Sequence, residues 1–177
     1  MAATRDVRDV RDVRDVRDVR EVRDEDLLRL DRQVCFSVHA ASRAFNSVYR
    51  EPLKELRLTY PQYLVMLALW EHDELAVKRL GALLRLDSGT LSPLLKRLEA
   101  VGYVERRRSA EDERSVVVRP TEAGRDLKAQ ALEIPRRIAT ATGLTLDEFH
   151  QLREHLDTLT RALDSAGESA EERTGES

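Results

Sequence analysis

Apolar side chains recur every three or four residues through most of the chain from residue 25 onward, which is the spacing of an amphipathic helix. The first run contains Leu27, Val34 and Val38, follows three acidic residues and precedes Pro52. It predicts a helix over about 25–50. Further runs predict helices over about 59–72, 77–85, 88–101, 121–142 and 145–163. The helix predicted over 121–142 contains Pro135, at which we expect a kink.

Two short extended runs, about 103–107 and 115–119, flank a polar loop and predict a β-hairpin. Short helices followed by a two-stranded hairpin indicate a winged helix-turn-helix, so the expected fold is mainly α with a small β-hairpin wing. Within a domain over 25–164, we expect a DNA-binding lobe at about 74–120. The helices at about 25–50 and 121–164 have apolar faces with little to cover them in so small a core. We therefore expect a helical dimerisation region and a homodimer.

The two ends of the chain have a different pattern. Residues 5–22 repeat Arg-Asp-Val five times and end with Arg20-Glu21-Val22. A period of three matches neither a helix nor a strand, so no fixed apolar face forms. We predict that 1–24 is a disordered arm and that 165–177 is a disordered acidic tail. An arm that contacts DNA is the less favoured interpretation, because each arginine lies beside an acidic residue.

Charge is distributed unevenly along the chain. The whole chain has 30 Lys and Arg against 33 Asp and Glu, for a net charge of −3, but residues 76–120 carry 10 basic and 6 acidic side chains. This local excess of four positive charges is typical of a surface that binds phosphate groups. A merely solvated basic face would give the same count.

Composition also limits the class of protein. No apolar stretch approaches the roughly 20 residues of a membrane span, and the N-terminus is charged from Arg5 onward, so we expect a cytoplasmic protein without signal peptide or membrane anchor. A single cysteine excludes an intrachain disulfide and a cysteine-rich metal site. We expect neither a metal nor a cofactor.

The candidate DNA-binding residues lie in the helix over 88–101 and in the hairpin. On the helix they are the polar residues opposite its leucine stripe, namely Ser88, Thr90, Ser92, Lys96 and Arg97. In the hairpin they are Arg106, Arg108, Asp112 and Arg114. An arginine at a hairpin tip suits a narrow minor groove, and Asp112 could pair with Arg114 and fix its direction. An ordinary exposed helix and a solvated turn are the alternatives.

Several motifs resemble those of a known family. Asp112-Glu113-Arg114, followed by Val118-Arg119-Pro120-Thr121-Glu122-Ala123-Gly124, resembles the wing signature of the MarR family of winged-helix repressors. Within that family, the following motifs together resemble the organic hydroperoxide resistance regulators: Gln33-Val34-Cys35-Phe36, Tyr60-Pro61-Gln62-Tyr63-Leu64, Leu69-Trp70-Glu71, Leu86-Asp87-Ser88-Gly89-Thr90-Leu91 and Lys96-Arg97. The resemblance covers about residues 27–163. It implies a DNA-binding repressor, not an enzyme, that binds a palindromic operator in double-stranded DNA.

Cys35 is the candidate with the most specific chemistry. By position alone it is a small, buried hydrophobic residue of a helix, but the resemblance implies that it is a peroxide sensor. A sensor thiol must be ionised, which requires a pKa well below the value of about 8.5 for a free cysteine. In the family, tyrosine hydroxyls that reach across the dimer stabilise the thiolate, and Tyr49 and Tyr60 occupy the matching positions. Core packing is the alternative role for both tyrosines.

His39 stands where the family commonly has a third tyrosine, and it could either donate a hydrogen bond to Cys35 or face solvent. Since the chain has no second cysteine, oxidised Cys35 must condense with a low-molecular-weight thiol to form a mixed disulfide, or over-oxidise. The resemblance implies that an organic hydroperoxide is the inducer and that peroxide-resistance genes are derepressed.

Three other functions compete with this one. The first is a MarR-type repressor released by a small aromatic ligand, with a structural Cys35. The second is a thiol peroxidase, although a lone cysteine lacks a turnover route of its own and the basic segment would be unexplained. The third is a helical scaffold without a DNA partner, which predicts no salt-dependent binding to DNA.

Overall fold

A computed structural model of the chain describes residues 27–109 and 115–175. It divides into two compact units, residues 1–44 and 45–177, which are considered separately. The predicted arm at 1–24 and the predicted wing tip, including Asp112 and Arg114, lie outside the described residues.

In the first unit, the helix predicted from residue 25 is interrupted before it becomes regular. A short 3-10 turn, η2 (Leu30–Arg32), precedes α2 (Val34–Glu55), which continues into the second unit. The backbone is extended at Arg29 and Gln33, and the Gln33 side chain donates hydrogen bonds to the carbonyls of Leu27 and Arg29. The predicted start at 25 lies outside the described residues; within them the continuous helix begins at Val34, because this side chain takes carbonyls that helical N–H groups would otherwise bind.

The predicted end of that helix at about residue 50 was also wrong. Pro52 lies inside α2 instead of beyond its end. Proline removes one helical hydrogen bond, but Pro52 and Leu53 are both buried. Burial of apolar side chains offsets the lost bond, so the helix continues for one more turn.

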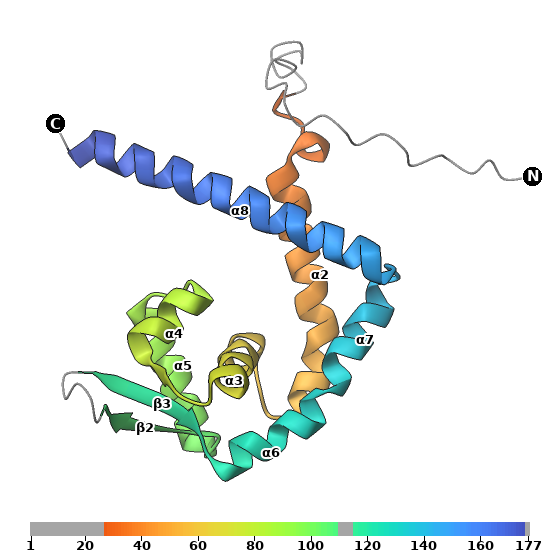
Figure 1. The fold of residues 1–177 in the computed structure, drawn as a ribbon. Coiled ribbons are helices and arrows are strands. Elements are labelled where there is room, and N and C mark those ends of the chain that lie inside the picture. Colours follow the sequence, from red (N-terminus) through yellow and green to blue (C-terminus); the bar gives the residue numbers. More distant parts are fainter. Residues whose placement is uncertain (1–26, 110–114, 176–177) are drawn as a thin grey trace, which may run out of the picture. The chain divides into compact units, whose positions relative to one another are not determined.

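The second unit contains the predicted winged-helix module. It consists of α3 (Tyr60–His72), β1 (Leu75–Ala76), α4 (Val77–Leu84), α5 (Ser88–Val101), β2 (Val104–Arg108) and β3 (Val116–Pro120) (Figure 1). Strands β2 and β3 pair antiparallel from Val104 with Pro120 to Arg108 with Val116. The mainly helical fold with a hairpin wing is confirmed, and the predicted bounds of α4 and α5 hold to within one residue.

A third strand was not predicted. The sheet has the order β1-β3-β2, because Leu75 and Ala76 pair antiparallel with Val118 and Val117. Two residues are too few to produce an alternating pattern, so the sequence contains no signal for this strand. Its pairing joins the start of α4 to the wing.

The helices after the wing are α6 (Glu122–Ala131), α7 (Glu133–Thr142) and α8 (Leu146–Gly175). The predicted single helix over 121–142 is broken at Leu132, three residues before the predicted kink. Pro135 then lies in the first turn of α7, where proline is tolerated. Helix α8 begins with the predicted capping box of Thr145 and Glu148. It continues through most of the segment predicted to be a disordered tail, so that prediction was wrong.

The core of the second unit is formed by leucines of α3, α4 and α5 together with Val104 and Val118 of the sheet. A close approach at Gly124 joins this core to α6. The Trp70 indole donates a hydrogen bond to the Gly124 carbonyl at 2.8 Å, and a Cβ at Gly124 would lie 2.0 Å from the Tyr103 carbonyl oxygen. Only glycine fits here, and this fit fixes the base of the wing against α3 and α6.

Candidate nucleic-acid interface and sensor site

Helix α5 presents two faces of opposite character. Leu91, Leu94, Leu95 and Leu98 are buried. On the other face, Ser88, Thr90, Lys96 and Arg97 are exposed and Ser92 is half-buried. The structure therefore brings all five predicted helix residues onto the accessible part of α5, where they can contact DNA.

The start of α5 is held by Asp87. Its carboxylate accepts hydrogen bonds from the Thr90 amide at 2.8 Å and from the Thr90 hydroxyl at 3.0 Å. Both hydrogen bonds lower the pKa of Asp87, and the one from the Thr90 amide has the larger effect. Since the hydroxyl proton of Thr90 is directed at Asp87, Thr90 can meet DNA only as a hydrogen-bond acceptor or through its methyl group.

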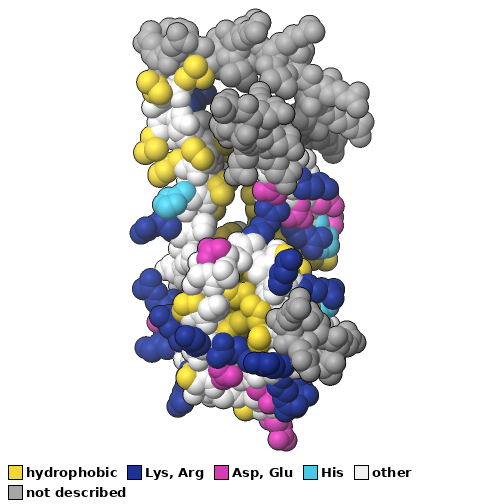
Figure 2. Space-filling view, turned by 90° about the vertical axis from the view of Figure 1, so that its left-hand side faces the viewer, with side chains coloured by type: hydrophobic (Ala, Val, Ile, Leu, Met, Phe, Trp, Pro, Cys, Tyr) yellow, Lys and Arg dark blue, Asp and Glu magenta, His cyan; other side chains and the backbone are white. Residues whose placement is uncertain are grey.

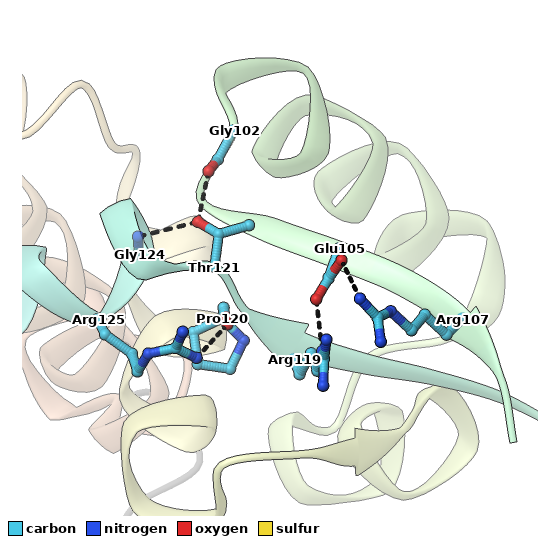
Figure 3. A network of polar contacts seen from close by, with 8 residues as sticks. All are labelled: Gly102, Glu105, Arg107, Arg119, Pro120, Thr121, Gly124 and Arg125. Atoms are coloured by element: carbon cyan, nitrogen blue, oxygen red, sulfur yellow. Dashed lines mark hydrogen bonds and ion pairs between the residues drawn. The ribbon is translucent and has the colours of Figure 1, made fainter. Parts of the chain in front are cut away.

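The arginines of the wing have unequal roles. Arg106 donates to the carboxylate of Glu99 on α5 at 2.9 Å, so this predicted DNA contact fastens the wing to α5. Glu105 accepts from Arg107 at 3.0 Å and from Arg119 on the opposite strand (Figure 3). Arg108 is exposed, and among the described residues it has no ion-pair partner. Of the described wing residues, Arg108 has its charge most available for a phosphate group.

A group of hydrogen bonds connects the end of the wing to α5 and α6. The Thr121 hydroxyl donates to the Gly102 carbonyl at 2.6 Å and accepts from the Gly124 amide at 3.1 Å, and Arg125 donates to the Pro120 carbonyl (Figure 3). Thr121 therefore caps α6 while it holds the C-terminus of α5. Lys and Arg side chains gather on the side of the second unit that carries the wing, in the lower half of Figure 2.

Sequence reasoning missed the carboxylates that hold these arginines. Glu99 lies seven residues before Arg106 in the chain, and Glu105 lies opposite Arg119 only through the strand register. The register itself could have identified the second pair, since directly opposed residues of opposite charge are common in antiparallel strands.

The candidate sensor Cys35 lies in the first turn of α2 and is exposed, as is His39 one turn later. Residues four apart on a helix lie on the same face, so the structure places these two predicted residues on one side of α2. The apolar residues beside them are also exposed, including Val34, Phe36 and Val38. An exposed apolar face around a lone thiol is a surface that another chain could cover.

In the second unit, Tyr49 and Tyr60 form a pair. Their ring centroids are 4.7 Å apart, and Tyr63 lies 6.1 Å from Tyr49. Burial, with smaller effects of Tyr60 and Tyr63, raises the pKa of Tyr49 to about 12. Tyr49 therefore stays protonated at neutral pH and can act as a hydrogen-bond donor.

The tyrosine pair lines a hollow of about 530 Å³ at the junction of α2 and α3. This volume is in the range of ligand-binding pockets. Leu53, Leu58 and Pro61 form apolar parts of its wall. Another hollow, between α3 and the α6–α7 junction beside Trp70, has about 240 Å³, which is below that range.

Helix α8 carries an uncovered apolar stripe. Its members alternate in steps of three and four residues and are Phe149, Leu152, Leu156, Leu159 and Leu163. Four of the five are 37–63% exposed. This is the repeat with which one helix packs against another, so α8 presents a surface for a second helix.

Within residues 27–109 and 115–175, no helix is both long and apolar enough to cross a membrane. The same residues contain no group of three His, Cys, Asp or Glu side chains placed to hold a metal ion.

The known proteins that this chain resembles in sequence are transcriptional regulators. A family model described as "Transcriptional regulator SarA/Rot" matches residues 47–131. The HTH-type transcriptional regulator TtmR of Methylorubrum extorquens is 48% identical, over 83% of this chain and 75% of that protein. The organic hydroperoxide resistance transcriptional regulator of Bacillus subtilis is 46% identical, over 78% of this chain and 94% of that protein.

Among solved structures, reduced AbfR bound to DNA is similar, with 36% identity and a TM-score of 0.63 over 78% of this chain and 97% of that one. A second structure, of AbfR of Staphylococcus epidermidis, has 34% identity and a TM-score of 0.65 over 80% of this chain and 97% of that one. The similarity therefore extends from sequence to fold across most of the described residues.

Proposed function

This chain belongs to the MarR family of winged-helix transcriptional regulators, in the group of the organic hydroperoxide resistance regulators, and we propose that it is a repressor released from its operator by oxidation of Cys35. The observation that carries the proposal is 46% identity over 94% of the Bacillus subtilis regulator, in a chain with a single cysteine. The inducer is an organic hydroperoxide, and the genes released encode peroxide resistance.

The DNA partner is double-stranded and palindromic. Ser88, Thr90, Ser92, Lys96 and Arg97 of α5 enter the major groove, and Arg108 contacts a phosphate group near the wing. Asp112 and Arg114 of the wing tip contact the minor groove. The DNA-bound relative AbfR supports this docking. Two copies related by two-fold symmetry place the two α5 helices on two half-sites.

The second copy is held through the apolar surfaces of α8 and the N-terminal part of α2. The stripe on α8 and the residues around Cys35 are apolar and exposed. When a second chain covers them, each buried leucine contributes about 1.5–3 kcal/mol. The proposed homodimer therefore rests on the helices outside the winged-helix module.

The tyrosines that act on Cys35 come from the second copy. Cys35 and Tyr49 lie fourteen residues apart in α2, whereas side chains of one helix meet when they are three or four residues apart. Tyr49 is protonated at neutral pH because its pKa is about 12. Its hydroxyl and that of Tyr60 donate hydrogen bonds to the partner's Cys35 and favour the thiolate. His39 lies on the same helix face as Cys35 and donates a further bond.

Oxidation proceeds in two balanced steps. The Cys35 thiolate attacks the distal oxygen of the hydroperoxide, the O–O bond breaks, and sulfenic acid and an alkoxide form; the alkoxide takes a proton to become an alcohol. A low-molecular-weight thiol then attacks the sulfenic sulfur, releasing water and leaving a mixed disulfide. Solved structures of AbfR in overoxidized and disulfide-formed states support an oxidisable cysteine in this group.

Release of DNA follows from the size of the mixed disulfide. A thiol adduct on Cys35 displaces Tyr49 and Tyr60 from their paired position at the junction of α2 and α3. Helix α3 packs against α4 and α5, so its displacement shifts the recognition helices. A palindromic operator requires their spacing to match one DNA turn, and binding is then lost.

The proposal is tested by measuring operator binding with an organic hydroperoxide and a small thiol present. We expect the wild type to dissociate and Cys35→Ser to remain bound under the same oxidant. If Cys35→Ser dissociates as well, the sensor role fails and a repressor released by a small aromatic ligand takes its place. Catalytic turnover of peroxide with excess thiol would instead support the peroxidase alternative.

A further inference from the structure

An ion pair joins the turn before helix α5 to helix α8. The Nη2 atom of Arg85 lies 2.8 Å from Oδ2 of Asp164, and Nη1 donates to Oδ1 at 3.0 Å. Each terminal nitrogen of the guanidinium therefore meets one carboxylate oxygen, a two-bond geometry that fixes direction as well as distance. The two residues lie 79 positions apart in the chain, so the contact depends on the fold and not on local sequence.

Arg85 occupies a backbone position at which glycine is the preferred residue. It directly follows α4 and has φ 54°, in the left-handed region. The Leu86 amide donates to the Gly81 carbonyl. The Arg85 amide donates to the Ala82 carbonyl, which completes the hydrogen-bond pattern of a Schellman C-cap. Helix α5 ends in the same pattern with Gly102, at φ 84°. A side chain at the end of α4 costs free energy that glycine does not, and this side chain is the one that binds α8.

The turn between α4 and α5 is short enough to transmit this restraint. Only Leu86 and Asp87 separate Arg85 from Ser88, the first residue of α5. Asp87 holds the start of α5 by accepting a hydrogen bond from the Thr90 amide. Fixing Arg85 therefore fixes the end of α5 that carries two of the proposed DNA contacts, Ser88 and Thr90.

The covalent path from α5 to α8, in contrast, is long and bent. It runs through the wing, α6 and α7, with a break between α6 and α7 at Leu132 and a left-handed Gly143 at the end of α7. Arg85 and residues 154–161 of α8 line a hollow of about 720 Å³. All of its described lining residues are polar or charged, so the ion pair, and not apolar packing, connects the end of α4 to α8 here.

We propose that Arg85 and Asp164 are positioning residues for operator binding, because their ion pair braces α5 against α8 and so sets the distance between the two α5 helices of the dimer. This inference rests on the proposed function, in which α8 forms the dimer interface. Asp164 directly follows Leu163, the last residue of the apolar stripe on α8. A palindromic operator presents its half-sites at a fixed separation, so a dimer without the brace binds less tightly and tolerates other separations better.

The first test compares the operator affinities of Asp164→Asn and Glu154→Gln on the full chain. Both substitutions remove one negative charge from α8 near Arg85, and Glu154 lines the same hollow, so both change the general attraction to DNA alike. Only Asp164→Asn breaks the ion pair. An exposed pair changes an equilibrium constant by up to about five-fold, so we expect Asp164→Asn to bind about three-fold more weakly per half-site than the control, or about ten-fold for the dimer. Equal affinities of the two variants would overturn the inference.

The second test uses operators with one base pair added or removed between the half-sites. Such a change rotates one half-site by about 35° and shifts it by about 3.4 Å. We expect the wild type to lose at least about ten-fold in affinity on the altered operators, and Asp164→Asn to lose about three-fold less than the wild type. A merely structural role of the ion pair would not change this spacing preference. Equal losses in the wild type and in Asp164→Asn would contradict the brace.

Arg85→Gln and the double variant with Asp164→Asn distinguish a brace from a direct contact with DNA. For a brace, each single substitution weakens binding, and the double variant binds no more weakly than Arg85→Gln, since both changes break one interaction. If Arg85 instead bound a phosphate group in competition with Asp164, Asp164→Asn would bind the operator more tightly than Glu154→Gln, and the inference would be wrong.

Failure of the inference can be distinguished from failure of the proposed function. A wild type that binds no palindromic operator would overturn both. A wild type that binds such an operator with a sharp spacing preference, together with Arg85→Gln and Asp164→Asn proteins that keep that preference, would overturn the brace alone.

Discussion

The winged-helix module and helix α8 differ most in how much of their apolar surface is covered. Leu69, Leu80, Leu98 and Val118 of the module are completely inaccessible to solvent. On α8, Leu152 and Leu156 are about two-fifths exposed, and Leu163 is 63% exposed. The module has its own core, whereas α8 leaves an apolar stripe with the spacing of helix-helix packing exposed. The difference supports the proposal that DNA contact and dimer assembly reside in separate parts of the chain.

Two glycine substitutions should differ most between these regions in their effect on the free energy of unfolding. Gly124→Ala places a Cβ 2.0 Å from the Tyr103 carbonyl oxygen, so we expect a loss of roughly 3 kcal/mol or more in the free energy of unfolding. Gly167→Ala on α8 meets no atom within 4 Å and should stabilise the helix by about 0.5–1 kcal/mol. Urea unfolding of both variants checks the pair, and equal effects would contradict the assigned close approach at Gly124.

A charge in the stripe of α8 should affect assembly and leave the module folded. Leu156→Asp removes about 1.5–3 kcal/mol of apolar burial per copy from the proposed interface. We expect sedimentation to detect monomers at concentrations where the wild type is dimeric, with operator affinity reduced at least about ten-fold. Arg153→Gln, also exposed on α8, is the matched control. A dimer that persists in Leu156→Asp would place the interface elsewhere.

Within the wing, Arg108 and Arg106 should separate DNA contact from stability. Arg108→Ala removes an exposed charge from each copy of the proposed dimer, so the slope of log affinity against log salt should become shallower by about 0.9 per lost phosphate contact, or about 1.8 for the dimer. Arg106→Ala breaks the ion pair with Glu99 and should lower stability by up to about 1 kcal/mol. Salt titrations of operator binding, with melting curves on the same proteins, distinguish the two. Identical slopes for wild type and Arg108→Ala would remove Arg108 from the interface.

The smallest effect is expected from Tyr49 at high pH. Its pKa is about 12 in the folded chain, against an ordinary value of 10.0. Between these values the unfolded chain loses the proton first, so the stabilisation is complete below pH 10 and is lost as pH rises toward 12. Wild type should therefore lose roughly 1 kcal/mol relative to Tyr49→Phe over this window. Parallel stability curves for the two proteins would show that Tyr49 is not perturbed by burial.

Sequence reasoning located elements whose apolar pattern is long and regular, such as α5 and the wing strands. It failed where a single side chain or a tertiary contact decides the outcome. Gln33 ends one helical segment before α2, and burial of Leu53 carries α2 past Pro52. The two-residue strand β1 exists only through its pairing with β3. Such effects depend on contacts formed in the folded chain, and no local pattern encodes them.

The candidate site, like the fold, could be predicted only in part from the sequence. The exposed face of α5 and the Tyr49–Tyr60 pair could be expected from spacing and resemblance. The capture of Arg106 by Glu99 could not, because the pair joins a helix to a strand. The pairing of Arg85 with Asp164 was also missed, because 79 positions separate them in the chain. Only the fold brings the end of α4 to α8.

The central claim is that Cys35 becomes a reactive sensor only when a second copy supplies the tyrosines. Mixed dimers test this claim directly. One copy carries Cys35→Ser with both tyrosines intact, and the other keeps Cys35 but carries Tyr49→Phe and Tyr60→Phe. The measurement is the rate of alkylation of Cys35 by iodoacetamide at neutral pH. We predict that the mixed dimer recovers the wild-type rate per thiol, whereas the dimer of two tyrosine variants reacts slowly. A mixed dimer as slow as the tyrosine-variant dimer would contradict the account.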